Sequence, residues 1–276
     1  MERKEIRSLW DFSNPTLSEK RFREAIQNEP DTKTKAELMT QLARSLGLQR
    51  KFVEAHAILD TIPNEDNRVH ALMLLERGRC YNSAGKTDKA KPLFKEAFDF
   101  CNEKNEENLA IDAIHMMAIV SEPQEALKLN YIGIKLAENA IEEQARNWLG
   151  SLLNNTAWTL HDSGEYEKAL EIFIKGLEFR EEKGQGRDIR IAKWCVARCL
   201  RSLGRIDEAM AILRVLETKE ADGYVYEELG ELLLILQKEI EASVYFAKAF
   251  ELLSQDPTLQ EREKPRLDRL LALSMV

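Results

Sequence analysis

The sequence predicts an all-α fold in which helical hairpins stack on one another as an α–α superhelix. Two features of composition favour helix along most of the chain. Only 7 prolines and 12 glycines occur in 276 residues, and alanine, leucine, glutamate, lysine and arginine dominate. The third observation is a pattern of small and bulky residues that recurs at intervals of 33 to 43 residues. Such self-similarity is typical of proteins whose repeats pack on their neighbours.

Each copy of the pattern describes two helices that cross closely. A glycine or another small residue lies in the first helix, a bulky residue follows three positions later, and an alanine opens the second helix after a turn. In one copy, Gly78 and Ala90 allow the close approach, while Tyr81 and Phe94 fill the space beside it. The alanines that open the second helices, here called the anchor alanines, are Ala55, Ala90, Ala126, Ala169, Ala209 and Ala242.

These residues resemble the tetratricopeptide repeat, a helix–turn–helix unit of about 34 residues. The resemblance covers roughly residues 34–256 and implies six such repeats in a right-handed solenoid. Residues 1–33 are then an N-terminal half-repeat that caps the stack, and residues 257–276 a C-terminal capping helix. The two longest intervals between anchor alanines predict extra turns or loop within residues 137–148 and 179–189. A looser similarity to uncharacterised bacterial repeat proteins rests on Leu9-Trp10-Asp11-Phe12 and implies a bacterial source.

The charge balance limits the classes of partner. Acidic residues outnumber basic ones by 48 to 40, and the net charge of −8 disfavours nucleic acid and anionic membranes. No apolar run approaches the about 18 residues of a membrane span. The charged start, Met1 to Glu5, lacks the apolar run of a signal peptide, and the four cysteines form no C-x-x-C pair. We therefore expect a cytoplasmic protein with free thiols.

The repeat register predicts which side chains face a ligand. With each anchor alanine counted as position twenty, positions two, five, nine and twelve lie opposite the core-facing side of the first helix, at about 100° per residue. The resemblance implies that this side lines a concave surface on which peptide ligands bind. The predicted binding residues, here called the first-helix stripe, are Arg44, Arg79, Asn82, His115, Asn154, Trp158, His161, Trp194, Arg198, Arg201 and Tyr224.

The first-helix stripe is rich in side chains that bind peptides. Arginine grips carboxylates through two hydrogen bonds, tryptophan offers apolar area with an N–H donor, and Asn82 and Asn154 can bond an extended backbone. We therefore predict an adaptor or protein-interaction module that binds another protein through an extended segment, acidic or with a free C-terminal carboxylate, in the groove. A peptide-sensing regulator that acts through a partner protein is the alternative, and binding of single-stranded RNA through arginine and tryptophan is a further one.

Two simpler interpretations compete with a ligand-binding role. The arginines can pair with glutamates of the next helix, and Trp158 and Trp194 can pack between repeats. The carboxylate clamp of the resembled family uses a lysine and an asparagine, whereas the matching places here hold Thr40 and Arg44. A ligand of the kind that this clamp binds is therefore not expected.

Candidates for catalysis or metal binding are few. His115 and His161, with Asp162 nearby, have the residue types of an acid–base pair or of metal ligands. Cys195 and Cys199 are four residues apart on one helix face and are candidate zinc ligands. Polar stripe residues and small buried thiols explain them better, because no other pair completes a site. The sequence contains no H-E-x-x-H motif, nucleotide-binding loop or calcium loop. We expect no enzymatic activity, no metal and no cofactor.

Overall fold

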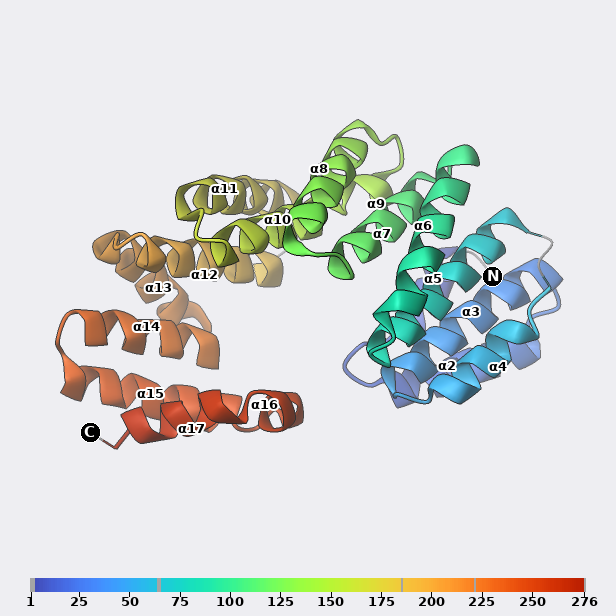
Figure 1. Cartoon of the computed structure of the whole chain (residues 1–276). Coiled ribbons are helices and arrows are strands. Elements are labelled where there is room, and N and C mark those ends of the chain that lie inside the picture. The colour runs from blue at the N-terminus through green and yellow to red at the C-terminus, as the bar shows by residue number, and fades with distance from the viewer. Residues whose placement is uncertain (1–2, 64–65, 185, 221, 276) are drawn as a thin grey trace. The chain divides into compact units, whose positions relative to one another are not determined.

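The computed structural model describes residues 3–63, 66–184, 186–220 and 222–275, and all the regular elements in these ranges are helices (Figure 1). The predicted all-α class of stacked helical hairpins is confirmed. The chain divides into two compact units, unit 1 (Met1–Leu152) and unit 2 (Leu153–Val276). Among the described helices, none has the length and apolar character to cross a bilayer. The outer limits of the two predicted terminal segments, residues 1–2 and 276, lie outside the described residues.

Unit 1 is a succession of helices that pack in pairs. An extra short helix, α9, lies within the interval 137–148, where the spacing of the anchor alanines predicts additional turns. The helices are α1 (Arg3–Ser8), α2 (Pro15–Asn28), α3 (Thr32–Leu48), α4 (Phe52–Asp60), α5 (Asn67–Ser83), α6 (Thr87–Glu103), α7 (Glu107–Ile119), α8 (Pro123–Asn139) and α9 (Glu143–Arg146), followed by α10 (Leu149–Asp162), which contains the unit boundary.

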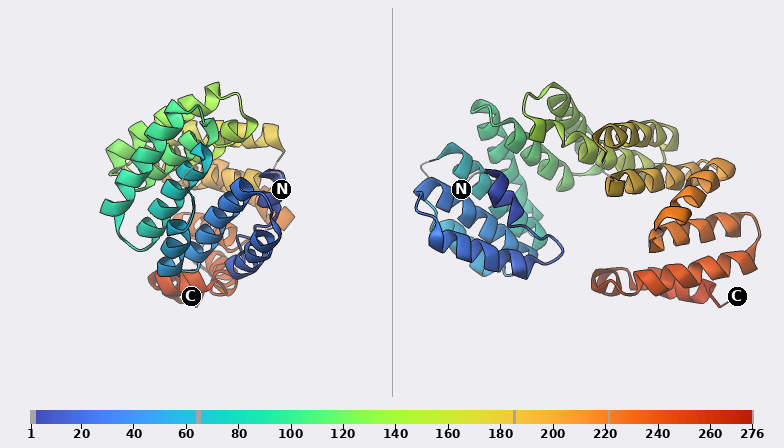
Figure 2. Two further views of the ribbon diagram at one scale, coloured as in Figure 1. Left: turned by 90° about the vertical axis from the view of Figure 1, so that its right-hand side faces the viewer. Right: turned by 180° about the vertical axis from the view of Figure 1, so that it is seen from behind.

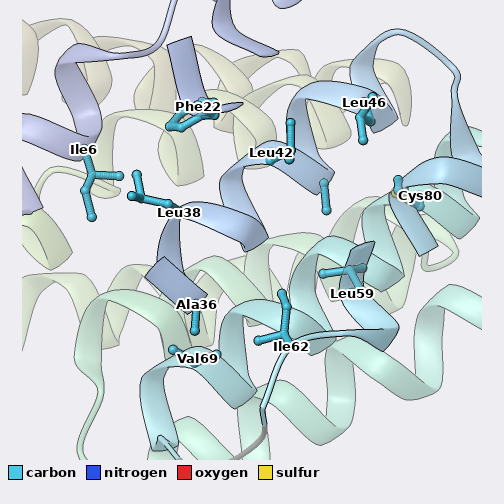
Figure 3. Packing of buried hydrophobic residues seen from close by; sticks show 12 residues of the cluster. Ile6, Phe22, Ala36, Leu38, Leu42, Leu46, Leu59, Ile62, Val69 and Cys80 are labelled. Atoms are coloured by element: carbon cyan, nitrogen blue, oxygen red, sulfur yellow. The ribbon is translucent and has the colours of Figure 1, made fainter. Parts of the chain in front are cut away.

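The N-terminal core of unit 1 joins the first helices of the chain. Ile6 of α1 and Phe22 of α2 pack with Leu38 and Leu42 of α3, and Leu59 of α4 closes the cluster (Figure 3). Phe22 and Leu59 are fully buried. Burial of a side chain of this size stabilises the fold by roughly 1.5–3 kcal/mol relative to its exposure to water.

The close helix crossing predicted from the repeat pattern is present in both units. A Cβ atom added to Gly78 of α5 would lie 2.5 Å from the ring of Phe94 on α6, so only glycine fits there. Gly230 and Phe246 repeat this arrangement, with a distance of 2.8 Å. All six anchor alanines are buried. The small residue therefore sets how closely the two helices of a hairpin approach, and the phenylalanine fills the remaining space.

Substitution of Gly78 by alanine is expected to lower the free energy of unfolding by about 1–3 kcal/mol, because the methyl group must displace the Phe94 ring. Gly176, in the middle of α11 (Tyr166–Lys183), is a matched control, since a Cβ there would lie at an ordinary 3.6 Å from the Cβ of Leu153. Gly176→Ala should stabilise the protein by up to about 1 kcal/mol through helix propensity. Urea denaturation of both variants measures the difference, and equal effects would contradict this packing argument.

Unit 2 continues the same hairpin pattern. Helix α15 packs against α14 on one side and α17 on the other, as both views of the C-terminal part show (Figures 1 and 2). After α11, the helices are α12 (Gly186–Ser202), α13 (Ile206–Glu220), α14 (Gly223–Ile235), α15 (Glu239–Leu253), α16 (Pro257–Arg262) and α17 (Lys264–Leu273).

The C-terminal segment differs from the single capping helix expected over residues 257–276. It contains two helices, α16 and α17, which meet at Glu263. Pro265 explains the break, because its ring would clash with the carbonyl of Glu261 in a continuous helix. The proline instead occupies the first turn of α17, where its missing N–H costs nothing.

Candidate functional site

The first-helix stripe falls into two groups, one in each unit. Arg44, Arg79, Asn82 and His115 belong to unit 1, on α3, α5 and α7. The others belong to unit 2, on α10, α12 and α14: Asn154, Trp158, His161, Trp194, Arg198, Arg201 and Tyr224.

In unit 1, Arg79 lies between two carboxylates. It donates to the Oε1 atom of Glu76 at 2.6 Å, one turn earlier on α5, and to Asp112 of α7. Arg44 of α3 is 3.7 Å from the same Oε1 atom. The Glu76 side chain is fully buried and that of Arg79 is 15% exposed. The charge of Arg79 is thus neutralised within the unit, as the interpretation of inter-helix pairing requires.

A cavity of about 180 Å³ lies beside this network. Its polar walls come from the network and from the end of α5, and Leu48 and Met116 add apolar surface. The Arg44 guanidinium is also 5.7 Å from the ring centroids of both Trp10 and Phe12, which stack on each other. The polar residues that line the cavity are Arg44, Glu76, Arg79, Asn82 and Ser83.

His115 lies between the charge network and an aromatic ring. Its ring packs 5.1 Å from that of Trp148, and its Nδ1 atom is buried without a hydrogen-bond partner among the described residues. Burial lowers the pKa of His115, which keeps its imidazole neutral at pH 7. Within the ranges that the structure describes, no three His, Cys, Asp or Glu side chains come together as metal ligands would.

In unit 2, the stripe is a row of aromatic rings. Trp158 contacts His161, Phe173 and Trp194, with ring centroids 5.1, 5.1 and 6.0 Å away. Trp194 in turn lies 5.9 Å from Tyr224 and donates its indole N–H to the Tyr224 carbonyl at 3.1 Å. Both tryptophans are half-buried, so they pack between helices and still present part of their surface.

The two stripe arginines of unit 2, Arg198 and Arg201, share one buried carboxylate. Glu228 of α14 accepts from Arg201 with both oxygens, at 2.7 and 3.0 Å, and lies 3.1 Å from Nε of Arg198. Arg198 also donates to the Ser202 hydroxyl, which is 2.9 Å from Nε2 of His161. Burial lowers the pKa of His161, and the nearby Arg198 acts in the same direction. Two guanidinium groups here share the carboxylate of Glu228, and the charges of Glu227 and Glu231 also act on Arg201.

The remaining polar residue of the stripe, Asn154, is 3.7 Å from the Cys195 thiol. Cys199 donates to the Tyr166 carbonyl. Both cysteines are buried, and burial raises the pKa of each thiol to about 11. Neutral thiols at pH 7 are poor nucleophiles and poor metal ligands. Their environment is that of small packing residues.

A second cavity, of about 280 Å³, opens at the N-terminal part of α12. Trp194, Leu216 and Tyr224 supply apolar walls, and Arg187 and Arg190 supply positive charge. The lining also includes Asp222, whose carboxylate accepts from the Val225 N–H at the start of α14. The two arginines were not among the predicted site residues. They lie seven and four residues before Trp194, hence on the same face of α12, and extending the stripe back by two turns would have found them.

Comparisons with known proteins agree with this architecture. The tetratricopeptide repeat family model matches residues 149–183, and no curated protein sequence matches the chain. Among solved structures, a tetratricopeptide repeat protein from Parabacteroides merdae ATCC 43184 has 19% identity and a TM-score of 0.58, over 99% of this chain and 97% of that one.

The quorum sensor NprR from B. thuringiensis, in its apo form, has 13% identity and a TM-score of 0.66, over 98% of this chain and 79% of that one. NprR in complex with its cognate peptide NprX has 15% identity and a TM-score of 0.56, over 99% and 84%. At these identities the structures establish a shared fold. With one repeat matched by the family model and paired helices of this type in both units, the chain has the fold of tetratricopeptide repeat proteins.

Proposed function

We propose that this protein is an interaction module that binds an extended, acidic segment of another polypeptide through the first-helix stripe of unit 2. The single observation that carries the proposal is the cavity of about 280 Å³ with aromatic walls, where two arginines outnumber one carboxylate, Asp222, that already caps α14. A cavity of this kind accepts an apolar side chain while its rim holds a carboxylate. The peptide complex of the fold neighbour NprR supports the same class of ligand.

Arg187 is the cation best placed for a ligand. It is exposed, and within the described ranges it has no ion-pair partner. Arg198 and Arg201, by contrast, are held by Glu228. A carboxylate that reaches the cavity therefore meets Arg187 without having to displace an existing partner. The guanidinium group provides two parallel donors for that carboxylate.

The aromatic row gives the ligand a direction along the unit. From the cavity, Trp194 leads to Trp158, whose ring is 6.0 Å away, and on to His161. The Asn154 amide lies beside this row, close to Cys195. An extended segment anchored at Arg187 can thus lay apolar side chains on the tryptophans and bond its backbone to Asn154.

A hexapeptide library made in two forms, with a free C-terminal carboxylate or a carboxamide, tests the proposal. We expect the protein to select an Asp, a Glu or the free carboxylate next to an aliphatic or aromatic residue. In the double variant Arg187→Glu/Arg190→Glu, the affinity for a selected peptide should fall at least about tenfold, since charge-assisted hydrogen bonds contribute about 1.5–3 kcal/mol.

The matched control is Arg205→Glu/Arg214→Glu, which makes the same change in net charge on α13 and its preceding turn. Both arginines are about half-exposed and pair locally with Glu208 and Glu217. Their replacement should alter the affinity by no more than about twofold, because exposed pairs contribute little. Selection of basic or neutral peptides, or equal loss in both double variants, would refute the proposal.

A peptide-sensing regulator is the second candidate, and the fold shared with the quorum sensor NprR favours it. In such a protein, ligand binding changes the arrangement of the repeats and thereby a surface for a partner protein. Small-angle scattering with a saturating selected peptide should then give a smaller radius of gyration. An unchanged radius would leave the adaptor and eliminate the regulator.

A further inference from the structure

We infer that the unit 1 cavity is a binding site for an amide group, which donates an N–H to Glu76 and accepts from Arg44. The inference deepens the proposed function, since it assigns a second recognition element for a polypeptide ligand. It rests on unit 1 residues alone and is tested with small amides, so its outcome is independent of the peptide test in unit 2.

One carboxylate oxygen of Glu76 is an unused hydrogen-bond acceptor. The Oε1 atom of Glu76 accepts from Arg79, whereas Oε2 is buried and has no hydrogen-bond partner among the described residues. Glu76 itself lines the cavity and its side chain is fully buried. A buried polar atom without a partner costs about 1–3 kcal/mol. A ligand that brings a donor to this oxygen recovers that free energy on binding.

The guanidinium of Arg44, on the same wall of the cavity, is an unused hydrogen-bond donor. Arg44 lies 3.7 Å from Oε1 of Glu76, too far for a hydrogen bond, and its guanidinium donates none within the part of the chain that the structure describes. Burial lowers the pKa of Arg44, and the charge of Arg79 acts in the same direction. This guanidinium therefore has capacity for an acceptor.

The charges around the unit 1 cavity are already balanced. Arg44 and Arg79 are opposed by Glu76 and Asp112, so the network is neutral without a ligand. A carboxylate or an ammonium group would introduce a net charge into this half-buried site, at a cost. An amide supplies a donor and an acceptor on adjacent groups and adds no charge; a primary amide presents them on one edge, and a trans peptide bond on opposite edges. Leu48 and Met116 provide apolar contacts for the carbon atoms that carry it.

Four small probes test the inference on the wild-type protein: propionamide, N-methylacetamide, propionate and n-propylammonium. Nuclear magnetic resonance shifts of the Gly47 and Ser83 amides, which line the cavity, report binding. We expect at least one of the amides to bind at least about tenfold more tightly than either ion. Preference for propionamide indicates a glutamine or asparagine side chain as the natural group, and equal binding of N-methylacetamide indicates a peptide bond.

A matched pair of variants separates hydrogen bonding from charge. Glu76→Gln turns the unused acceptor into a donor and should reverse the preference, so that propionate binds more tightly than propionamide. Asp112→Asn makes the same charge change without touching the free oxygen, and should alter the propionamide affinity by no more than about threefold. The ligand series on the wild type decides the question even if Glu76→Gln fails to fold.

Three results would overturn the inference. The ions could bind as well as the amides, the two variants could behave alike, or no probe could produce saturable shifts at Gly47 and Ser83. The last result would mean that the cavity holds water only.

Discussion

Replacing Arg79 with leucine is expected to lower the free energy of unfolding by about 3–5 kcal/mol. Arg79 is the shared partner of Glu76 and Asp112, whose side chains are 0% and 9% exposed. Without the guanidinium, two carboxylates remain buried with only Arg44, 3.7 Å from Glu76, to offset them. Each then loses its charge-assisted hydrogen bond while still carrying the cost of its removal from water.

Urea denaturation of Arg79→Leu against Arg77→Leu measures this effect. Arg77 lies on the same helix and pairs with Asp60, which is 65% exposed, so its loss should cost less than about 1 kcal/mol. The double variant Arg79→Leu/Asp112→Leu should recover much of the stability, because Arg44 and Glu76 then remain as a neutral pair. Equal losses in the two single variants would show that the network contributes no more than a surface pair.

The expected loss of stability makes Arg79 variants unsuitable for tests of ligand binding. A charge reversal such as Arg79→Glu places a third carboxylate beside two buried ones, and a loss of binding would then follow from unfolding of unit 1. Arg187 of unit 2 is exposed and avoids this problem. Arg79 and Arg198 therefore stabilise the packing between repeats, and the exposed Arg187 is the better probe of a ligand.

In unit 2, Glu228→Gln is expected to lower the free energy of unfolding by about 2–3 kcal/mol. The carboxylate of Glu228 is 5% exposed and holds both Arg198 and Arg201. The loss should be smaller than in unit 1, since the two arginines are 27% and 19% exposed and can regain some hydration. Glu208→Gln, at an exposed local pair with Arg205, is the control and should change the stability by less than about 1 kcal/mol.

The same variant has a second, independent readout. With Arg198 and Arg201 released, added sulfate should raise the melting temperature of Glu228→Gln more than that of the wild type, because an anion that binds only the folded state stabilises it. A variant as stable as the wild type, or one that responds to sulfate no more than Glu208→Gln does, would contradict the role assigned to Glu228.

The repeat pattern of the sequence was sufficient to predict the hairpins and their contacts. The pairs Gly78–Phe94 and Gly230–Phe246 meet as expected, and the anchor alanines are buried. These features depend on helix propensity and on the size of side chains at a fixed spacing within one hairpin. Local rules of this kind act over less than one repeat, so a single sequence contains them in full.

The partners of the stripe arginines required the tertiary structure. Arg44, Arg79 and Arg198 each face a carboxylate at position six of the following repeat, respectively Glu76, Asp112 and Glu228. The residue types are visible in the sequence. Whether such a pair closes, however, depends on the angle and distance between successive hairpins, which the packing of the whole unit sets.

The two cavities show most clearly the difference between what the sequence predicts and what only the tertiary structure reveals. By itself, the sequence determined an all-helical repeat protein, and it predicts which face of each first helix a ligand meets. Only the tertiary structure decided that Arg187 and Arg190 join Trp194 and Tyr224 around a cavity, and that one oxygen of Glu76 meets no donor among the described residues. The physical reason is that a cavity is the space that side chains from several helices fail to fill, and no single helix specifies it.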